Sequence, residues 1–263
     1  MNLFENNRGK SNIVIVLVFM SFLSAAILTV LLFASFWKKN FGQPAQEYKT
    51  SALPELVTMD NNKGIIAKYN DDFYISTITD EIFAEIDGIS FNELTPVTRD
   101  ELRYIHVLHC GIDGKDHEGE LIVNKVIAQD ILQIFYELYI IDYPIEKMVL
   151  VDNFHGNDDI SMTINNTSAF NSRYVSDTDE LSLHAYGLAV DVNPLYNPYV
   201  GNDDIVLPNS SRQYVDRTQT FSMKMDENDI CVRTFVAHGF TWGGDWTGVK
   251  DYMHFEYTDA ETD

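Results

Sequence analysis

The chain is poor in cysteine and in basic residues. Its 263 residues include two cysteines, which excludes a cysteine-rich zinc module and a scaffold held together by many disulfides. The 18 Lys and Arg residues are outnumbered by 40 Asp and Glu residues, giving a formal net charge of −22. A surface of that sign repels a phosphate backbone. We therefore expect no nucleic-acid partner, but a partner that is neutral, cationic or drawn in by a bound metal.

The sequence also lacks internal repeats, low-complexity segments and a calcium-binding loop. A calcium site needs oxygen ligands closely spaced in one loop, and the acidic stretches 202–204 and 226–229 do not have that pattern. Apolar residues are plentiful, at 45% of the chain with 13% aromatics. This composition can form a folded core and excludes a largely disordered protein.

Residues 13–37 form an uncharged, strongly apolar run of 25 residues. At about 1.5 Å per residue, a helix of that length crosses a hydrocarbon core of roughly 30 Å, so we predict a transmembrane signal anchor. The alternative is a cleaved signal peptide, whose apolar region is usually about 7–15 residues long. Basic residues flank both ends of the run and leave its orientation open. A short segment, 1–12, before a large C-terminal domain favours a single-pass membrane protein with 1–12 in the cytoplasm and the domain outside.

The rest of the chain is predicted to be a stalk followed by one domain. Residues 38–74 are polar and contain Gly, Pro and Asn breakers, which indicates a stalk with at most weak structure. In residues 75–263 the periodicity predicts helices at 79–86, 124–141 (with Asn124 as its cap) and 229–238, strands at 102–109 and 148–151, further alternation at 160–164, and a long surface loop at 196–217. The expected fold class is α+β, with a small antiparallel sheet and flanking helices.

Two short segments carry the residue types of a catalytic zinc site. His184 precedes Asp191 by seven residues, and Asp251 precedes His254 by three. A catalytic zinc ion takes three His or carboxylate ligands and keeps one open position, so His184, Asp191 and His254 form a candidate Zn²⁺ set. Residues seven apart on a straight strand face opposite sides. A bend at Gly187 is therefore needed to bring the first two ligands to one metal.

Asp251 is the candidate general base. Such chemistry needs a carboxylate beside the metal that takes a proton from the attacking water. If His254 lies on a strand, Asp251 lies at the mouth of that strand, and Glu256 is either a partner of the ligands or a surface charge. The alternative for the whole pattern is a scatter of surface His and Asp residues in an acidic protein. His106 and His109 fall on opposite faces of one predicted strand and are not expected to share a metal.

These motifs resemble those of the zinc D-alanyl-D-alanine carboxypeptidases of bacterial cell walls. That family includes vancomycin-resistance-type carboxypeptidases and phage L-alanyl-D-glutamate endopeptidases. Its Ser-x-His-x-x-Gly-x-Ala-x-Asp pattern corresponds to Ser182 through Asp191, and its acid-x-x-His pattern to Asp251 through His254. The similarity extends over about 78–257. Many carboxypeptidase members have Glu where this chain has Asp251, and the shorter acid is similar to the phage endopeptidases.

The resemblance implies a zinc metallopeptidase that hydrolyses amide bonds next to D-amino acids in peptidoglycan stem peptides, as a D,D-carboxypeptidase or an L-alanyl-D-glutamate endopeptidase. It implies that the three candidate ligands bind zinc, that Asp251 is the base, and that Arg173 and Ser182 hold the substrate, with Arg173 stabilising oxyanion charge. An anchored domain outside the cell would reach this substrate. The alternative is a non-catalytic wall-binding domain on the same zinc scaffold. Cys110 and Cys231 are expected to be free buried thiols, with a disulfide as the alternative.

Overall fold

The computed structural model of the protein describes residues 54–60, 64–176 and 178–258, which belong to one unit that begins at Pro54. The predicted N-terminal segment 1–12, the anchor 13–37 and the first part of the stalk, 38–53, lie outside the described residues. Within the described part of the chain, no helix is long and apolar enough to cross a membrane.

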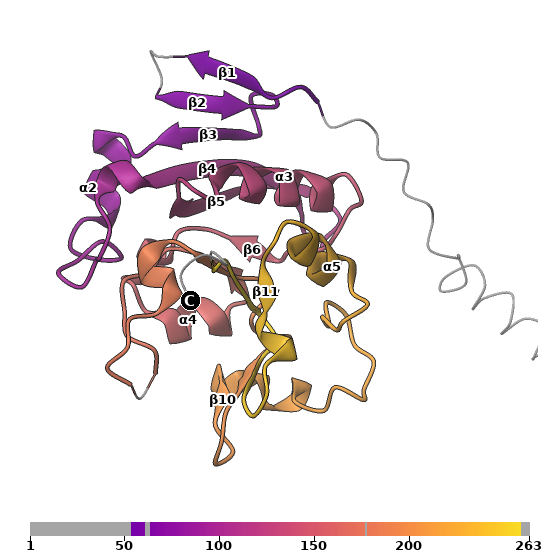
Figure 1. Cartoon of the computed structure of the whole chain (residues 1–263). Helices are drawn as coiled ribbons and strands as arrows, with labels where there is room; N and C mark the ends of the chain where they lie inside the picture. The colour runs from indigo at the N-terminus through magenta and orange to yellow at the C-terminus, as the bar shows by residue number, and fades with distance from the viewer. Residues whose placement is uncertain (1–53, 61–63, 177, 259–263) are drawn as a thin grey trace, which may run out of the picture. The chain divides into compact units, whose positions relative to one another are not determined.

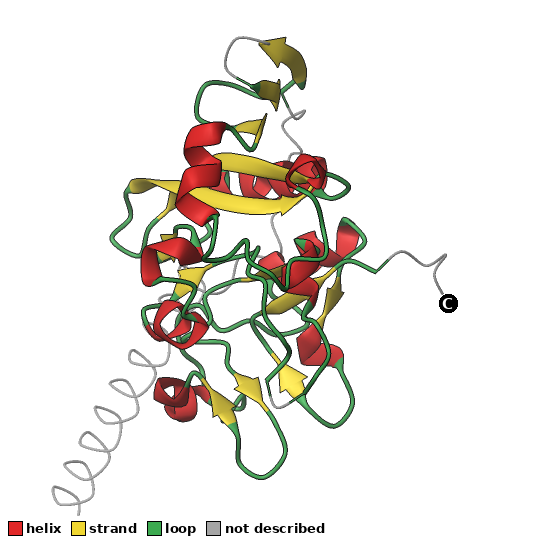
Figure 2. Cartoon of the chain, turned by 90° about the vertical axis from the view of Figure 1, so that its left-hand side faces the viewer, coloured by secondary structure: helices red, strands yellow, loops and turns green. Residues whose placement is uncertain are grey.

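An antiparallel sheet of five strands forms the first half of this unit (Figures 1 and 2). In spatial order its strands are β1 (Val57–Asp60), β2 (Ile65–Lys68), β3 (Tyr74–Thr77), β4 (Leu102–Cys110) and β5 (Asp116–Asn124). The two long strands, β4 and β5, pair from Leu102 opposite Asn124 to Cys110 opposite Asp116, with the predicted turn at 111–115 between them. The strand predicted at 102–109 is confirmed.

The stalk prediction is wrong for its last part, because β1 and β2 belong to this sheet. These strands have four residues each and lie at and next to the sheet edge. Short edge strands need little hydrophobic alternation, since a neighbouring strand supplies their hydrogen-bond partners. Gly64, which we interpreted as a breaker, takes a φ of +67° in the turn before β2.

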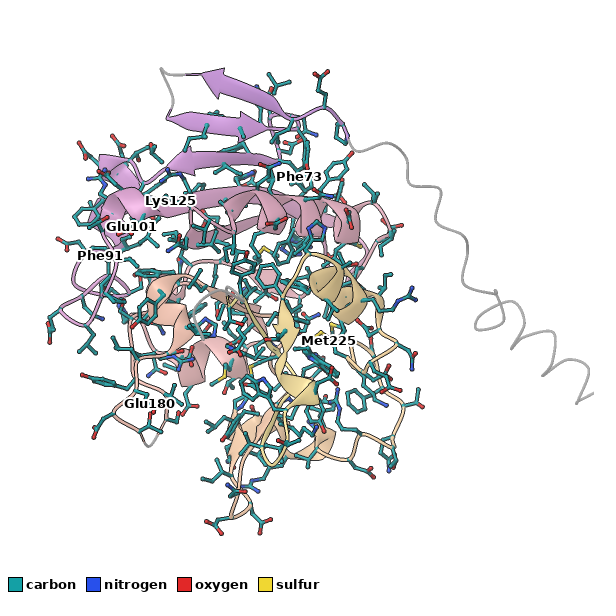
Figure 3. The ribbon with its side chains drawn as sticks, in the orientation of Figure 1. Phe73, Phe91, Glu101, Lys125, Glu180 and Met225 are labelled. Atoms are coloured by element: carbon teal, nitrogen blue, oxygen red, sulfur yellow. The ribbon has the colours of Figure 1, made fainter. Side chains whose placement is uncertain are left out.

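Four α-helices accompany the strands within the described residues. They are α2 (Asp80–Ile86), α3 (Ala128–Tyr139), α4 (Asp158–Thr163) and α5 (Ile230–Ala237). α3 lies along the sheet and packs with α5 into the main core, where the rings of Phe135 and Phe235 meet edge to face at 6.0 Å (Figure 1). Phe73, labelled in Figure 3, contacts the ring of Tyr136 on α3 from the sheet side. α2 and α5 match their predictions, and α5 is followed by Gly239 at a φ of +86°.

The helix predicted at 124–141 and the alternation at 160–164 differ from the structure. Asn124 is the last residue of β5 rather than the cap of α3, which begins four residues later, because pairing with Leu102 extends the strand. The alternation at 160–164 belongs to helix α4, which Asn157 caps by accepting a hydrogen bond from the amide of Ile160. Five residues with apolar positions four apart fit one helical turn as well as a strand, so that pattern could not separate the two.

Short antiparallel strands in the second half of the unit position the candidate site. One three-stranded sheet has the order β11 (Thr241–Trp242), β13 (His254–Glu256), β8 (Ala189–Asp191), and another the order β10 (Val206–Leu207), β9 (Tyr199–Val200), β12 (Lys250–Asp251). The predicted loop 196–217 thus contains a two-stranded hairpin. The strand predicted at 148–151 is limited to β6 (Lys147–Met148), paired in parallel with β7 (Asn166–Thr167). The predicted mixture of helices with small antiparallel sheets is confirmed.

Candidate metal centre

His184 lies in a short 3₁₀ turn, Leu183–Tyr186, that Gly187 ends with a φ of +67°. Ser182 begins this turn, and its hydroxyl oxygen accepts a hydrogen bond from the amide of His184 at 3.3 Å. The turn is attached to the end of β5, because the backbone amide of Asn124 donates to the carbonyl of Gly187 at 2.8 Å. The predicted bend at Gly187 is confirmed, and it turns the chain so that His184 lies beside the following strand.

Asp191 and His254 face each other across two antiparallel strands. Asp191 ends β8 and His254 begins β13, and the register makes them direct partners. Side chains of such partners project from the same face of the sheet with their Cβ atoms about 4.5–5.5 Å apart. Strand pairing therefore joins the two halves of the predicted ligand set, which are 63 residues apart in the sequence.

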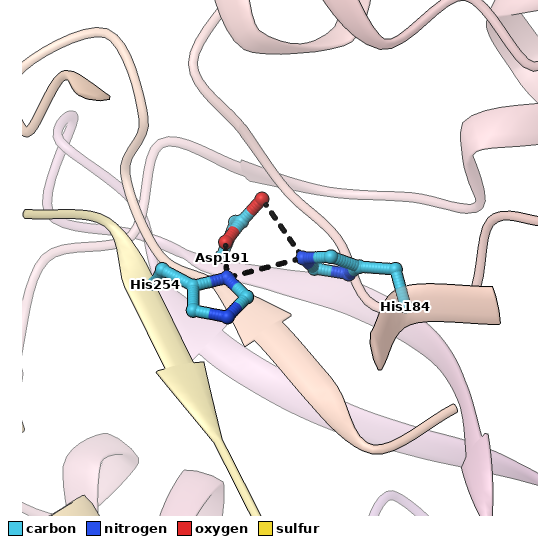
Figure 4. A group of neighbouring side chains, drawn as sticks. All are labelled: His184, Asp191 and His254. Carbon is cyan, nitrogen blue, oxygen red and sulfur yellow. Dashed lines mark hydrogen bonds and ion pairs between the residues drawn. The ribbon is translucent and has the colours of Figure 1, made fainter. Parts of the chain in front are cut away.

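The three predicted ligands meet in one buried cluster (Figure 4). His254 Nδ1 lies 2.9 Å from Asp191 Oδ1, and His184 Nε2 lies 3.3 Å from Asp191 Oδ2 and 3.3 Å from His254 Nδ1. The three residues are 3–7% exposed, and one donor atom from each lies within 4.8 Å of the others. Two imidazole nitrogens and a carboxylate oxygen converging on one point are the donor set of a catalytic zinc site.

Each histidine has a hydrogen-bond partner on the nitrogen that faces away from the cluster. His184 Nδ1 lies 2.5 Å from the carbonyl oxygen of Ala169, which leaves Nε2 directed at the other two residues. His254 Nε2 lies 3.2 Å from Glu256 Oε2, which leaves Nδ1 directed at them. Histidines that bind metals nearly always donate their second N–H in this way. The sequence left Glu256 open between two roles, and the structure places its carboxylate next to His254.

The electrostatics of the cluster suit a cation. Burial alone would raise the pKa of Asp191, but the charges and hydrogen bonds of His184 and His254 hold it below its usual range. Burial lowers the pKa of His254, yet hydrogen bonds to Asp191 and Glu256 raise it to about 10. A proton and a metal ion compete for the same ring nitrogen. The carboxylates around His254 favour a positive charge there, and a metal ion would have to displace the proton from the ring nitrogen that it binds.

Asp251 lies in the same cavity as the ligands, on β12, where it pairs with Tyr199 of β9. Its Oδ1 atom is buried and has no hydrogen-bond partner among the described residues. Burial raises the pKa of Asp251 to about 7, with a further rise from Asp191 and opposing effects from His254 and Arg173. A carboxylate of this kind can accept a proton near neutral pH.

Close packing of glycine holds the strand that carries Asp251. A Cβ atom on Gly243 would lie 2.6 Å from the carbonyl oxygen of Asp251, so only glycine permits this approach. The indole of Trp242 donates to the carbonyl of Tyr252 at 2.9 Å, and the ring of Trp246 lies 5.4 Å from that of His254. The Trp-Gly-Gly-Asp-Trp stretch therefore packs directly against the strands of the site.

The cavity has a volume of about 480 Å³, and Arg173 and Ser182 line it together with the ligands and Asp251. This volume is ordinary for a small-molecule or peptide site. Arg173 Nη2 forms an ion pair with Asp158 Oδ2 at 2.7 Å. Asp158 is the first residue of α4, and no motif in the sequence connects it with Arg173. The fold thus brings all six predicted site residues to one cavity.

The other candidates lie outside this group. His106 stacks on Tyr74 with ring centroids 4.9 Å apart, and its Nδ1 lies 2.9 Å from the carbonyl oxygen of Asp72. Among the described residues, the cluster that could hold a metal consists of His184, Asp191 and His254. Cys110 and Cys231 are both buried and free, which confirms the prediction of unpaired thiols.

The family comparison agrees with this geometry. Residues 176–257 match the family described as D-alanyl-D-alanine carboxypeptidase. The matched segment contains the three ligands and Asp251, and Arg173 lies just outside it. This result confirms the resemblance seen in the motifs and supports a peptidase of the D-alanyl-D-alanine carboxypeptidase type. A search of solved structures gave no significant match.

Proposed function

We propose that this protein is a membrane-anchored zinc peptidase that hydrolyses amide bonds next to D-amino acids in peptidoglycan stem peptides. The observation that carries the proposal is the buried group of His184, Asp191 and His254 in one cavity with Asp251. Three ligands leave one coordination position of a tetrahedral zinc ion for catalysis. When bound, zinc would supply a Lewis acid that polarises the amide carbonyl and makes water a stronger nucleophile at neutral pH.

Asp251 acts as the general base and then as the general acid. Its buried Oδ1 atom, which has no partner among the described residues, takes the proton from the attacking water. Because burial raises the pKa of Asp251 to about 7, the protonated carboxyl can then pass that proton to the leaving amine. One side chain therefore serves both halves of the reaction.

Arg173 and Ser182 hold the substrate at the scissile bond. Asp158 fixes the guanidinium of Arg173 in the cavity wall, where it stabilises negative charge that develops on the carbonyl oxygen. The hydroxyl oxygen of Ser182 accepts from the amide of His184, so its own O–H remains available to donate to a substrate carbonyl or carboxylate. The anchor at 13–37, with the domain outside the cell, would keep the enzyme next to its polymeric substrate.

The test uses the full-length protein in detergent, with its zinc content measured, and the variant Asp251→Asn. Stem peptides ending in D-alanyl-D-alanine and intact peptidoglycan are the substrates, with products identified by mass spectrometry. Release of D-alanine indicates a D,D-carboxypeptidase, and cleavage after L-alanine indicates an endopeptidase. We expect the variant to keep its zinc and lose about 10²–10⁴-fold in turnover.

Two results would contradict the proposal. Full activity of Asp251→Asn would remove this residue from the mechanism. Stoichiometric zinc with no cleavage of any stem peptide would favour the alternative of a non-catalytic wall-binding domain on the same scaffold.

A further inference from the structure

Glu256 and His254 are two residues apart on strand β13, so their side chains project from the same face of the strand. Glu256 Oε2 lies 3.2 Å from His254 Nε2. Its other oxygen lies 3.4 Å from the hydroxyl of Thr241, the residue opposite it on β11. The Glu256 side chain is 20% exposed, so it is largely enclosed between the strand and the cavity.

We propose that Glu256 is a positioning residue that fixes His254 in the tautomer that binds the metal through Nδ1. An ionised carboxylate only accepts hydrogen bonds, so the Nε2 atom beside it must carry the hydrogen. In the neutral ring, Nδ1 is then the unprotonated nitrogen, and it faces Asp191 and His184. Glu256 therefore sets the ring orientation and the position of the lone pair together.

The two histidines of the cluster need opposite tautomers. His184 directs Nε2 at the cluster and donates from Nδ1 to the carbonyl of Ala169, whereas His254 directs Nδ1 at the cluster. A backbone carbonyl fixes the first ring, and a side chain fixes the second. A carboxylate partner also increases the basicity of the ring more than a neutral carbonyl does, which strengthens its bond to a metal. We thus expect Glu256 to contribute to metal affinity by both hydrogen bonding and charge.

The experiment measures zinc affinity of the full-length protein by competition with a chromophoric chelator. We expect Glu256→Ala to weaken zinc binding by about 10–100-fold, the usual effect of losing such an outer partner. Glu256→Gln keeps an oxygen that accepts a hydrogen bond from Nε2 but removes the charge, so it should weaken zinc binding less than Glu256→Ala does. Glu180→Gln is the control of equal charge change, since Glu180 is an exposed carboxylate that lines the same cavity (Figure 3).

Cobalt(II) substitution supplies a second readout. A change of ligand or of ring orientation at His254 alters the visible absorption of bound Co²⁺, so Glu256→Ala should shift this spectrum and Glu180→Gln should not. The inference is overturned if Glu256→Ala binds zinc as tightly as the natural protein, or if Glu180→Gln weakens binding equally. If Glu256→Ala does not fold, the same criteria apply to Glu256→Gln.

This inference rests on the proposed metal site but is tested apart from the proposed catalysis. Tight zinc binding that depends on Glu256, without cleavage of stem peptides, would contradict the proposed function and leave the role of Glu256 intact. Cleavage of stem peptides by a protein whose zinc affinity does not change in Glu256→Ala would support the proposed function and contradict the role of Glu256.

Discussion

Replacing Gly187 by alanine tests whether the turn before β8 sets the metal site. Gly187 has a φ of +67°, a conformation that costs an L-residue about 1–2 kcal/mol. A Cβ atom there would also lie 2.7 Å from the backbone nitrogen of Asn124 and 3.1 Å from the carbonyl carbon of Val123. Backbone atoms cannot move aside as a flexible side chain can. Either the end of β5 or the turn that carries His184 must shift.

Gly88→Ala is the matched control for this substitution. Gly88 has a φ of +76°, and a Cβ atom there would meet nothing within 4 Å, so the variant carries the conformational strain without the collision. We expect Gly88→Ala to lose about 1–2 kcal/mol of unfolding free energy. Gly187→Ala should lose about 2–5 kcal/mol, because overpacking adds about 1–3 kcal/mol to the strain.

Urea unfolding of the metal-free proteins measures these losses, and chelator competition measures zinc affinity. In Gly187→Ala, displacement of His184 should weaken zinc binding by on the order of tenfold. Changes to residues that support a metal ligand usually cost about 10–100-fold in affinity, and this value is the lower end of that range. Gly88→Ala should bind zinc normally. Equal losses of stability in the two variants, with equal zinc affinities, would refute the argument that the collision with β5 positions His184.

Three further predictions concern charge. Burial raises the pKa of Asp229 from 3.8 to about 6, so the folded state binds this proton more tightly than the unfolded state does. The contribution of Asp229 to the free energy of unfolding therefore falls as the pH rises from about 4 to about 6. Asp229→Asn, which keeps an oxygen to cap α5, should remove up to about 3 kcal/mol of this pH dependence, measured by urea unfolding across the range. Asp158→Asn should lower kcat/KM because Arg173 is misplaced, while the free energy of unfolding changes by only about 0–1 kcal/mol. If Asp158→Asn lowers kcat/KM by the same factor with and without Arg173→Lys, the two residues do not act together. The acid limb of kcat/KM against pH should lie below pH 7, because a bound cation lowers the pKa of Asp251 from the value of about 7 that burial gives it. If the residual activity of Asp251→Asn shows the same acid limb, that limb belongs to another group.

Local patterns predicted the parts of the site that depend on neighbouring residues. The bend at Gly187 followed from the need to turn His184 toward Asp191, and the structure has it. Helix α5 lies where the periodicity predicts a helix, at 229–238, and Gly239 follows it at a φ of +86°. In each case the cause lies within about ten residues of the effect, where periodicity and turn chemistry carry information.

Features that depend on distant pairing could not be predicted in this way. The sequence of β1 and β2 reads as polar linker because β3, not their own alternation, holds them in the sheet. Asp158 is paired with Arg173 only because α4 packs beside the cavity. The distance from Glu256 to His254 depends on the rotamers of two side chains, for which spacing in the sequence gives no value.

The fold separates the residues that would hold the metal from those that shape the rest of the cavity. Asp191 and His254 lie on the sheet of β8, β13 and β11, whereas Asp251 lies on β12, in the sheet that the 196–217 segment builds. Tyr199 and Leu207, which line the cavity, belong to that second sheet. We therefore expect a change in the 196–217 segment to move Asp251 together with this wall of the cavity and to leave the pairing of Asp191 with His254 unchanged. Under the proposed function, such a change would alter which bond is cut while the metal site stays the same.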